Sequence, residues 1–142
     1  MPTRDYLIRQ FEEMGFFLAS LIRRLLKMKD DNQQEQMETA FREALIQELK
    51  LDIDQVIVLA NQDFLSHVKQ YFTSAEQLEK LADILKILGQ EKGPAFSLAK
   101  ANYLQKSLFL YTTLQETSDT YSYARREKML ELQELIRFSG LM

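Results

Sequence analysis

The chain has no cysteine, no tryptophan and a single histidine, and only four glycines and two prolines occur among its 142 residues. Without cysteine there is no disulfide framework and no thiol nucleophile, and this absence favours the cytoplasm over a secreted location. Sandwiches and barrels need many tight turns, so the shortage of glycine and proline argues against both. The composition instead favours long helices joined by short loops.

Long hydrophobic runs and a strong excess of one charge are also missing. The longest apolar run, residues 15–22, ends at two arginines and falls far short of the roughly 18–20 residues that cross a bilayer. Residues 1–5 do not have the shape of a signal peptide. With a net charge of −3, the chain has no general attraction to nucleic acid. We therefore expect a cytoplasmic protein that does not enter a membrane and does not use nucleic acid as its main partner.

Apolar residues, in contrast, recur at helical spacing along most of the chain. In segment 3–28 they alternate in steps of four and three, which is the heptad pattern of a helix packed lengthwise on other helices. This heptad seam consists of Leu7, Phe11, Met14, Leu18, Leu21, Leu25 and Met28. Similar spacing predicts helices over 33–49, 62–71 and 94–115. Segment 53–60 is the one stretch that could be extended, although the spacing of its apolar residues favours a short buried helix.

Short polar side chains mark where several of these helices should begin, because they satisfy the free amides of a first helical turn. The expected N-caps are Asp52, Asn61, Ser74 and Ser118-Asp119. Ser74 and Gln77 form a capping box, which opens a helix that should end near Gly89 or Gly93. Pro94 then suits the first turn of the next helix.

Together these patterns predict one all-α domain over residues 1–142, with about six helices in antiparallel hairpins. Residues 1–72 would contain the long N-terminal helix followed by shorter helices. Residues 73–142 would form a helical-hairpin region.

Two segments resemble the helix-turn-helix units of the tetratricopeptide-repeat-like superfamily: residues 81–89 (LADILKILG) and residues 103–108 (YLQKSL). The small residues in these segments allow two helices to approach closely. The whole chain is also similar to an uncharacterised bacterial family of short helical proteins with a domain of unknown function, through residues 5–11, 49–52 and 81–111. This resemblance implies a tetratricopeptide-repeat-like array in the C-terminal half and a bacterial source, and it implies no activity.

Residue patterns typical of catalysis or metal binding are missing. His67 lacks the second histidine and the partner glutamate of a helical di-iron site, and zinc would need cysteine or several histidines. There is no glycine-rich nucleotide-binding motif. We therefore assign no catalytic, metal-binding or cofactor-binding residue, and we do not expect an enzyme.

Carboxylates at helical spacing leave one enzymatic alternative open. Glu35 and Glu38 are three residues apart, and Glu127 and Glu131 are four apart, so each pair shares a helix face. Pairs of this kind are common on solvated faces. The alternative is a small enzyme whose cleft combines carboxylates with tyrosines.

Basic residues gather in two places, one near the end of the first predicted helix and one in the last helix. They are Arg23, Arg24 and Lys27 in the first place and Arg125 and Arg126 in the second. Positive charge near a helix C-terminus is favoured by the helix dipole, which explains the first group without a ligand. Weak nucleic-acid binding through these basic helix ends is the alternative.

Tyrosines crowd the last two predicted helices, at Tyr103, Tyr111, Tyr121 and Tyr123. We expect them to pack in the core with their hydroxyl groups at its rim. The alternative is a partner-binding groove, because tyrosine is enriched at protein interfaces.

Two phenylalanines in the first helix complete the set of candidate contacts. Phe17 lies on a flank of the heptad seam, whereas Phe16 lies opposite the seam at about 100° per residue. Phe16 is therefore covered by a flanking helix or exposed for a partner, which could be a second copy in a homodimer. With the four tyrosines, these residues are our candidate contacts for a protein or peptide, and the expected function is a protein–protein interaction or scaffold module.

Overall fold

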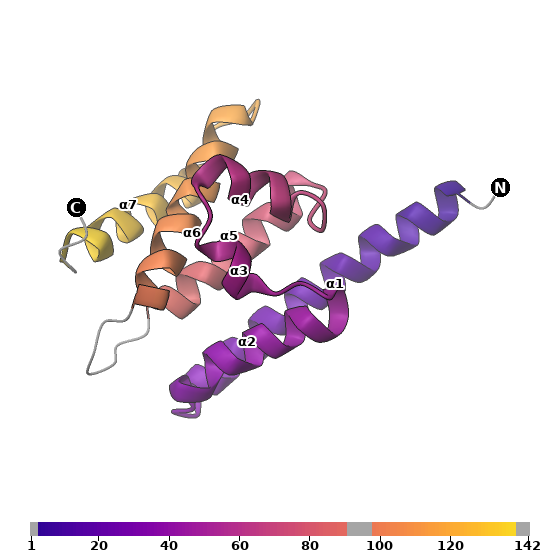
Figure 1. The fold of residues 1–142 in the computed structure, drawn as a ribbon. Helices are drawn as coiled ribbons and strands as arrows, with labels where there is room; N and C mark the ends of the chain where they lie inside the picture. The colour runs from indigo at the N-terminus through magenta and orange to yellow at the C-terminus, as the bar shows by residue number, and fades with distance from the viewer. Residues whose placement is uncertain (1–2, 91–97, 139–142) are drawn as a thin grey trace.

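The computed structural model describes residues 3–90 and 98–138, and every regular element in these ranges is an α-helix (Figure 1). The elements are α1 (Thr3–Asp30), α2 (Gln34–Leu49), α3 (Ile53–Ile57), α4 (Asn61–Val68), α5 (Ala75–Gly89), α6 (Leu98–Thr117) and α7 (Tyr123–Phe138). The predicted all-α class is confirmed. Seven helices are described where about six were expected, and segment 53–60 is helical over residues 53–57.

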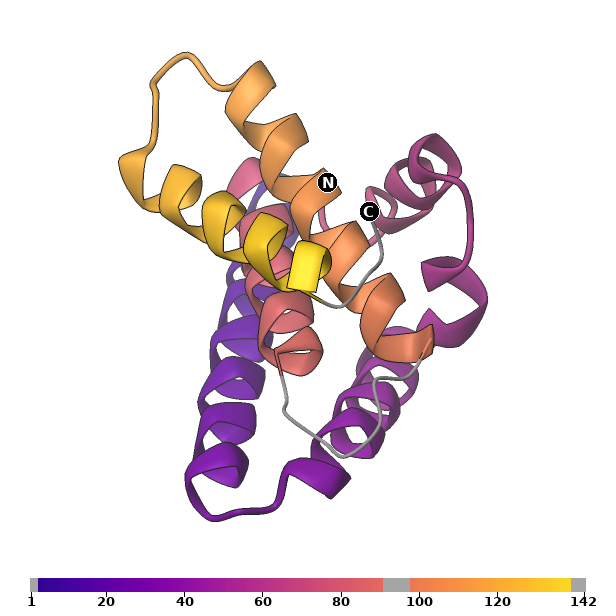
Figure 2. The ribbon, with the colours of Figure 1, turned by 90° about the vertical axis from the view of Figure 1, so that its left-hand side faces the viewer.

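Helix α5 lies at the centre of the assembly. It packs against α6 on one side and against α1 on the other, while α2 runs back along α1 (Figures 1 and 2). Helix α7 packs on α6, and the short helices α3 and α4 also contact α6. One apolar core joins all seven helices, with contributions from Leu18 in α1 through to Ile136 in α7.

The capping predictions are right at two helix starts. The Asp52 side chain accepts a hydrogen bond from the Asp54 amide at the start of α3. Ser74 accepts from the Gln77 amide at the start of α5, and the Gln77 side chain accepts in return from the amide of Thr73. Both starts are local motifs, so the sequence is sufficient to place them.

Two other capping predictions are wrong. Asn61 is the first residue of α4 rather than its cap, and its side chain accepts a hydrogen bond from Lys106 of α6. Helix α7 begins later than expected, because Ser122 rather than Ser118 or Asp119 accepts from the amide of Arg125. A contact with another helix thus takes the side chain of Asn61, whereas the Ser118 hydroxyl bonds with Thr120 within the α6–α7 connection. The Gly93-Pro94 boundary lies outside the described residues.

Helices α5 and α6 approach most closely at Gly89. A Cβ atom built on Gly89 would lie 2.6 Å from Leu104 Cδ2 and 3.2 Å from the Leu104 backbone nitrogen. Farther along the same α5–α6 contact, the buried Ser107 hydroxyl donates to the Ala82 carbonyl at 2.7 Å. Small residues thus bring the two helices together, as the two sequence motifs led us to expect.

Replacing Gly89 with alanine is expected to lower the free energy of unfolding by about 1–3 kcal/mol, because buried Leu104 has no room to move away. Gly15 is the matched control. It also lies inside a helix, but a Cβ there meets nothing within 4 Å, so Gly15→Ala should stabilise the protein by up to about 1 kcal/mol. Urea unfolding followed by circular dichroism measures both. Equal shifts for the two variants would contradict the close approach.

Candidate interaction surface

The N-terminal third of α1 projects beyond the other helices (Figure 1). All ten residues from Arg4 to Glu13 are exposed, although four of them have large apolar or aromatic side chains. We call residues 4–13 the α1 arm. Its large exposed apolar and aromatic side chains are Tyr6, Leu7, Ile8 and Phe11.

The arm exists because the heptad seam is longer than the surface that covers it. Leu18 and Leu25 on the seam are buried, since α2 and α5 pack against that part of α1. On the same seam, Leu7 is 60% exposed and Phe11 is 45% exposed. The arm therefore presents to solvent the same kind of surface that the rest of α1 buries.

A groove of about 710 Å³ lies at the base of the arm. We call it the arm groove; its lining comes from α1, the end of α2, the α4–α5 connection and the start of α5. The lining residues are Leu7, Gln10, Phe11, Glu13, Met14, Phe17, Glu48, Leu49, Gln70, Tyr71, Thr73 and Gln77. Six of these side chains are apolar or aromatic and six are polar, and the two charged members, Glu13 and Glu48, are both acidic.

Buried Gln77 ties the base of the arm to α5. Its side-chain nitrogen donates to the Phe11 carbonyl at 3.4 Å, while its amide and side-chain oxygen complete the cap of α5. The arm thus emerges from the body at a defined point. The capping-box pattern predicted the role of Gln77 in α5, but its contact with α1 spans 66 residues of sequence and had no local signal.

The two candidate phenylalanines have different surroundings. Phe17 is partly buried against the core and also lines the arm groove. Phe16 is 72% exposed, so neither α3 nor α4 covers it. Because Phe16 lies opposite the seam, it does not belong to the surface formed by Leu7 and Phe11.

The four candidate tyrosines separate into two pairs. Tyr103 and Tyr111 are buried in α6, which is the core packing that we expected, and in the folded chain they are not available to a partner. Tyr121 and Tyr123 are exposed beside the start of α7, with ring centroids 5.0 Å apart in an edge-on arrangement, so the expectation of core packing is wrong for this pair.

Burial, reinforced by nearby carboxylates, keeps both core tyrosines protonated. The Tyr111 hydroxyl donates to Asp83, and burial together with this hydrogen bond raises the pKa of Tyr111 well above its usual value. Burial and the negative charges of Glu38 and Asp54 raise the pKa of Tyr103 in the same direction. Neither phenol is poised to exchange a proton near neutral pH.

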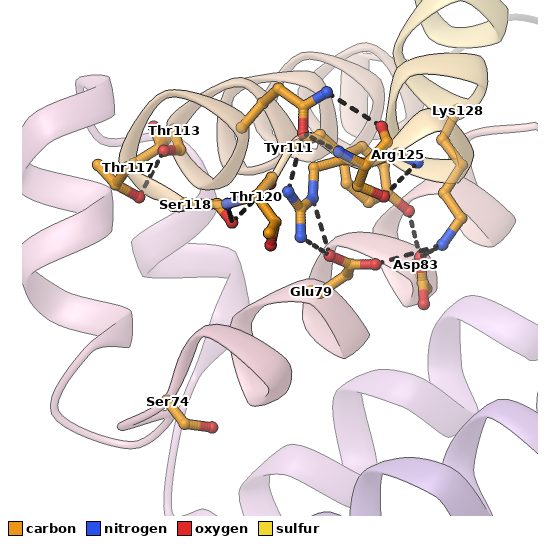
Figure 3. Close-up of polar contacts among 12 residues, drawn as sticks. Ser74, Glu79, Asp83, Tyr111, Thr113, Thr117, Ser118, Thr120, Arg125 and Lys128 are labelled. Atoms are coloured by element: carbon orange, nitrogen blue, oxygen red, sulfur yellow. Dashed lines mark hydrogen bonds and ion pairs between the residues drawn. The ribbon is translucent and has the colours of Figure 1, made fainter.

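Asp83 belongs to a charge cluster that fastens α7 to α5, made up of Glu79, Asp83, Arg125 and Lys128 (Figure 3). Arg125 Nε and an amino nitrogen of its guanidinium donate to Glu79 Oε1 at 2.8 and 2.6 Å. Lys128 Nζ lies 2.9 Å from Asp83 Oδ1 and 3.7 Å from Glu79 Oε2. Gln115 of α6 also accepts from Arg125, at 2.9 Å.

The predicted basic residues do not form one patch. Arg125 is neutralised in the charge cluster, and Arg126 donates to the Tyr121 hydroxyl at 3.0 Å. Arg23, Arg24 and Lys27 lie at the other end of the molecule, along the C-terminal part of α1, and are exposed. The carboxylates are likewise used in surface ion pairs, with Glu38 bound to Arg42 and Glu131 to Lys86.

Lys106 is a buried polar residue that sequence reasoning missed. Its ammonium group donates to the Leu59 carbonyl at 2.5 Å and to Asn61 Oδ1 at 2.9 Å, and it lies 5.5 Å from the centre of the Phe64 ring. Burial lowers the pKa of Lys106. The sequence signal was weak: Lys106 shares a helix face with Tyr103 and Leu110, which lie three residues before it and four after it. The contacts fasten the α3–α4 connection to α6.

Over residues 3–90 and 98–138 no group of three or more histidine and carboxylate side chains is arranged to hold a metal ion. His67 instead stacks on Tyr71, with ring centroids 6.2 Å apart. In the same ranges, no helix combines the length and apolar character that crossing a membrane requires.

Comparison of the chain with protein-family models, with curated proteins and with solved structures gives no significant match. The resemblance to a bacterial family and to tetratricopeptide-repeat-like hairpins therefore stays a prediction, and the surface has to be interpreted from its own geometry.

Proposed function

We propose that this chain is a protein–protein interaction module that binds an apolar helix along the α1 arm and in the arm groove. The observation that carries the proposal is the heptad seam of α1, which is buried at Leu18 and Leu25 but exposed at Leu7 and Phe11. A seam of this kind is built to pack against another helix. Exposed apolar faces next to a groove are typical of sites that bind amphipathic helices.

The charges at the groove favour a particular kind of partner. Glu13 and Glu48 are its charged lining residues, and no lysine or arginine belongs to the lining. A helix with an apolar stripe and flanking basic residues would place its stripe on Leu7 and Phe11 and its positive charges beside the two glutamates. Complementary charge of this type mainly raises association rate and specificity.

Binding is a better proposal than catalysis because the polar clusters already satisfy each other. Glu79 and Asp83 are engaged by Arg125 and Lys128, and the depression of about 340 Å³ beside them contains both carboxylates in these ion pairs. Tyr111 is a protonated hydrogen-bond donor to Asp83. We therefore propose a structural role for this cluster.

The proposed setting follows from the sequence. The lack of cysteine supports the cytoplasm, and the family resemblance supports a bacterial source with tetratricopeptide-repeat-like hairpins. Nucleic acid is a weaker candidate partner, because Arg125 is paired within the fold and lies in α7, whereas Arg23 and Arg24 lie in α1.

A synthetic helical peptide tests the proposal directly. The probe is a fluorescent amphipathic peptide of leucine and lysine, about 18 residues long so that it can form a stable helix on binding. Fluorescence anisotropy should show saturable binding, and Leu7→Glu should weaken it by at least about ten-fold, as expected for an interface hot spot. A peptide with glutamate in place of lysine should bind less tightly.

Val58→Glu is the matched control, because Val58 is another exposed aliphatic residue but lies after α3, outside the arm and the groove. Binding should be unchanged in this variant. If Val58→Glu weakens binding as much as Leu7→Glu, the peptide adheres to apolar surface in general and the proposed site is wrong.

A further inference from the structure

We infer that the helix bound by the α1 arm is the α1 arm of a second copy, packed antiparallel about a two-fold axis. This inference rests on the proposed function and names its partner. The arm supplies an apolar stripe formed by Leu7 and Phe11, with Arg4 on the same side of the helix at its N-terminal end. At about 100° per residue, of its other charged residues, Asp5, Arg9 and Glu12 lie away from this stripe. A two-fold arrangement lets one surface serve as both binder and ligand.

The heptad spacing fixes how two arms can pair. Two kinds of position alternate along the seam: after Leu7 the next seam residue is four positions on, and after Phe11 it is three positions on. In an antiparallel pair each kind packs against the other kind, so Leu7 of each copy faces Phe11 of the other. No other antiparallel register of the seam places both exposed residues of both copies in contact. The register in which Leu7 faces Phe11 also places Arg4 opposite Met14.

Placing Arg4 opposite Met14 brings a positive charge of one copy close to negative charges of the other. Met14 lines the arm groove, which also contains Glu13 and Glu48. The Arg4 side chain of one copy would lay its aliphatic part over Met14 of the other and bring its guanidinium to the acidic side of the groove. In a parallel pair, by contrast, Arg4 would face Arg4.

The bodies of the two molecules also fit this register. Residues Arg4 to Glu13 are exposed, and α1 enters the body at about Met14, where its seam side chains become partly buried. When Arg4 faces Met14, each arm ends where the other body begins. The exposed part of the seam in each arm is therefore covered over its full length. The two bodies lie at opposite ends of the paired arms.

Phe16 has no place in this dimer, since it projects from the opposite side of α1. The sequence led us to expect self-association through Phe16, and the inferred dimer uses the other face of the same helix. Because paired arms of about ten residues extend over only about 15 Å, we expect a weak dimer that forms at micromolar or higher concentration.

Sedimentation equilibrium of the intact chain over a concentration series tests the inference. The mass should rise from 16.7 kDa towards twice that value. Leu7→Glu and Phe11→Glu should each weaken dimerisation by at least about ten-fold, whereas Phe16→Glu should leave it unchanged. Circular dichroism confirms that each variant is folded. A dimer that is lost in Phe16→Glu but kept in Leu7→Glu would overturn the inference.

Disulfide trapping tests the register, and the cysteine-free sequence makes it simple. Arg4→Cys chains mixed with Met14→Cys chains should form the mixed disulfide on mild oxidation, as mass spectrometry can show. Preferential Arg4→Cys homodimers would indicate a parallel pair and overturn the inferred register.

The peptide experiment separates this inference from the proposed function. A chain that stays monomeric at every concentration but binds the leucine–lysine peptide through Leu7 would overturn self-pairing and leave the interaction module intact. A chain that neither dimerises nor binds the peptide would overturn both.

Discussion

Raising the pH from 9 to 11 is expected to lower the free energy of unfolding by about 1.4 kcal/mol for each of Tyr103 and Tyr111, or about 2.7 kcal/mol for the two. The pKa of each buried phenol is raised in the folded protein. Above pH 10 the unfolded chain therefore loses these protons while the folded chain keeps them. The folded state binds more protons, so its stability falls as the pH rises.

Phenylalanine variants assign this loss to the two residues. In Tyr111→Phe, the decrease in the free energy of unfolding between pH 9 and pH 11 should be about half as large as in the unmodified chain. In the Tyr103→Phe/Tyr111→Phe double variant it should be small. Urea titrations at pH 9 and pH 11 provide the measurement, with circular dichroism as the signal because the chain has no tryptophan. An unchanged alkaline loss in the double variant would mean that other groups cause it.

Lys106 acts in the opposite direction over a lower pH window. Burial lowers the pKa of this ammonium group in the folded protein, so between its folded pKa and 10.5 the unfolded chain binds more protons. Its contribution to stability therefore rises with pH and is complete near 10.5. The loss caused by the tyrosines develops mainly above pH 10, so the two effects overlap, and the phenylalanine variants are needed to separate them.

Removing the Glu79 carboxylate is expected to have the second large effect. Glu79→Ala should lower the free energy of unfolding by about 1.5–3 kcal/mol, because it leaves the guanidinium of Arg125 without its carboxylate partner. The Arg125 side chain is only 13% exposed, so water compensates poorly for the lost hydrogen bonds. Thermal or urea unfolding at pH 7 measures the change.

Glu131→Ala is the matched control for this prediction. Glu131 also pairs with a basic residue across two helices, at 2.7 Å from Lys86, but its side chain is 57% exposed. Its loss should cost no more than about 1 kcal/mol, as for other surface ion pairs. If Glu79→Ala lowers the free energy of unfolding no more than Glu131→Ala does, the charge cluster does not fasten α7 to α5. A ligand-binding role for its carboxylates then becomes the better explanation.

The sequence was a good guide wherever the signal was local. Apolar spacing predicted the all-α class, and the capping motifs at Asp52 and Ser74 were placed correctly because each involves residues no more than three positions apart. Core packing of Tyr103 and Tyr111 was also expected, since both continue the apolar face of their helix. Asn61 and Ser118 were misassigned because the contacts that decide their roles come from elsewhere in the fold or from a competing nearby residue.

The candidate surface was predicted only in part. The heptad seam of α1 was visible in the sequence, and so was the position of Phe16 opposite it. Which part of the seam is exposed could not be known, because Phe11 and Leu18, seven residues apart, occupy equivalent places in the pattern. The carboxylate partner of Arg125 and the oxygen partners of Lys106 could not be identified from the sequence, since they lie more than forty residues away along the chain.

By itself, the sequence determined that this chain folds as packed helices and that α1 has one continuous apolar face, because helical periodicity is a property of neighbouring residues. Only the tertiary structure decided that α2 and α5 cover that face from Leu18 onwards and leave Leu7 and Phe11 exposed. Exposure depends on where distant segments end and pack, and that is set by the whole core rather than by any local pattern.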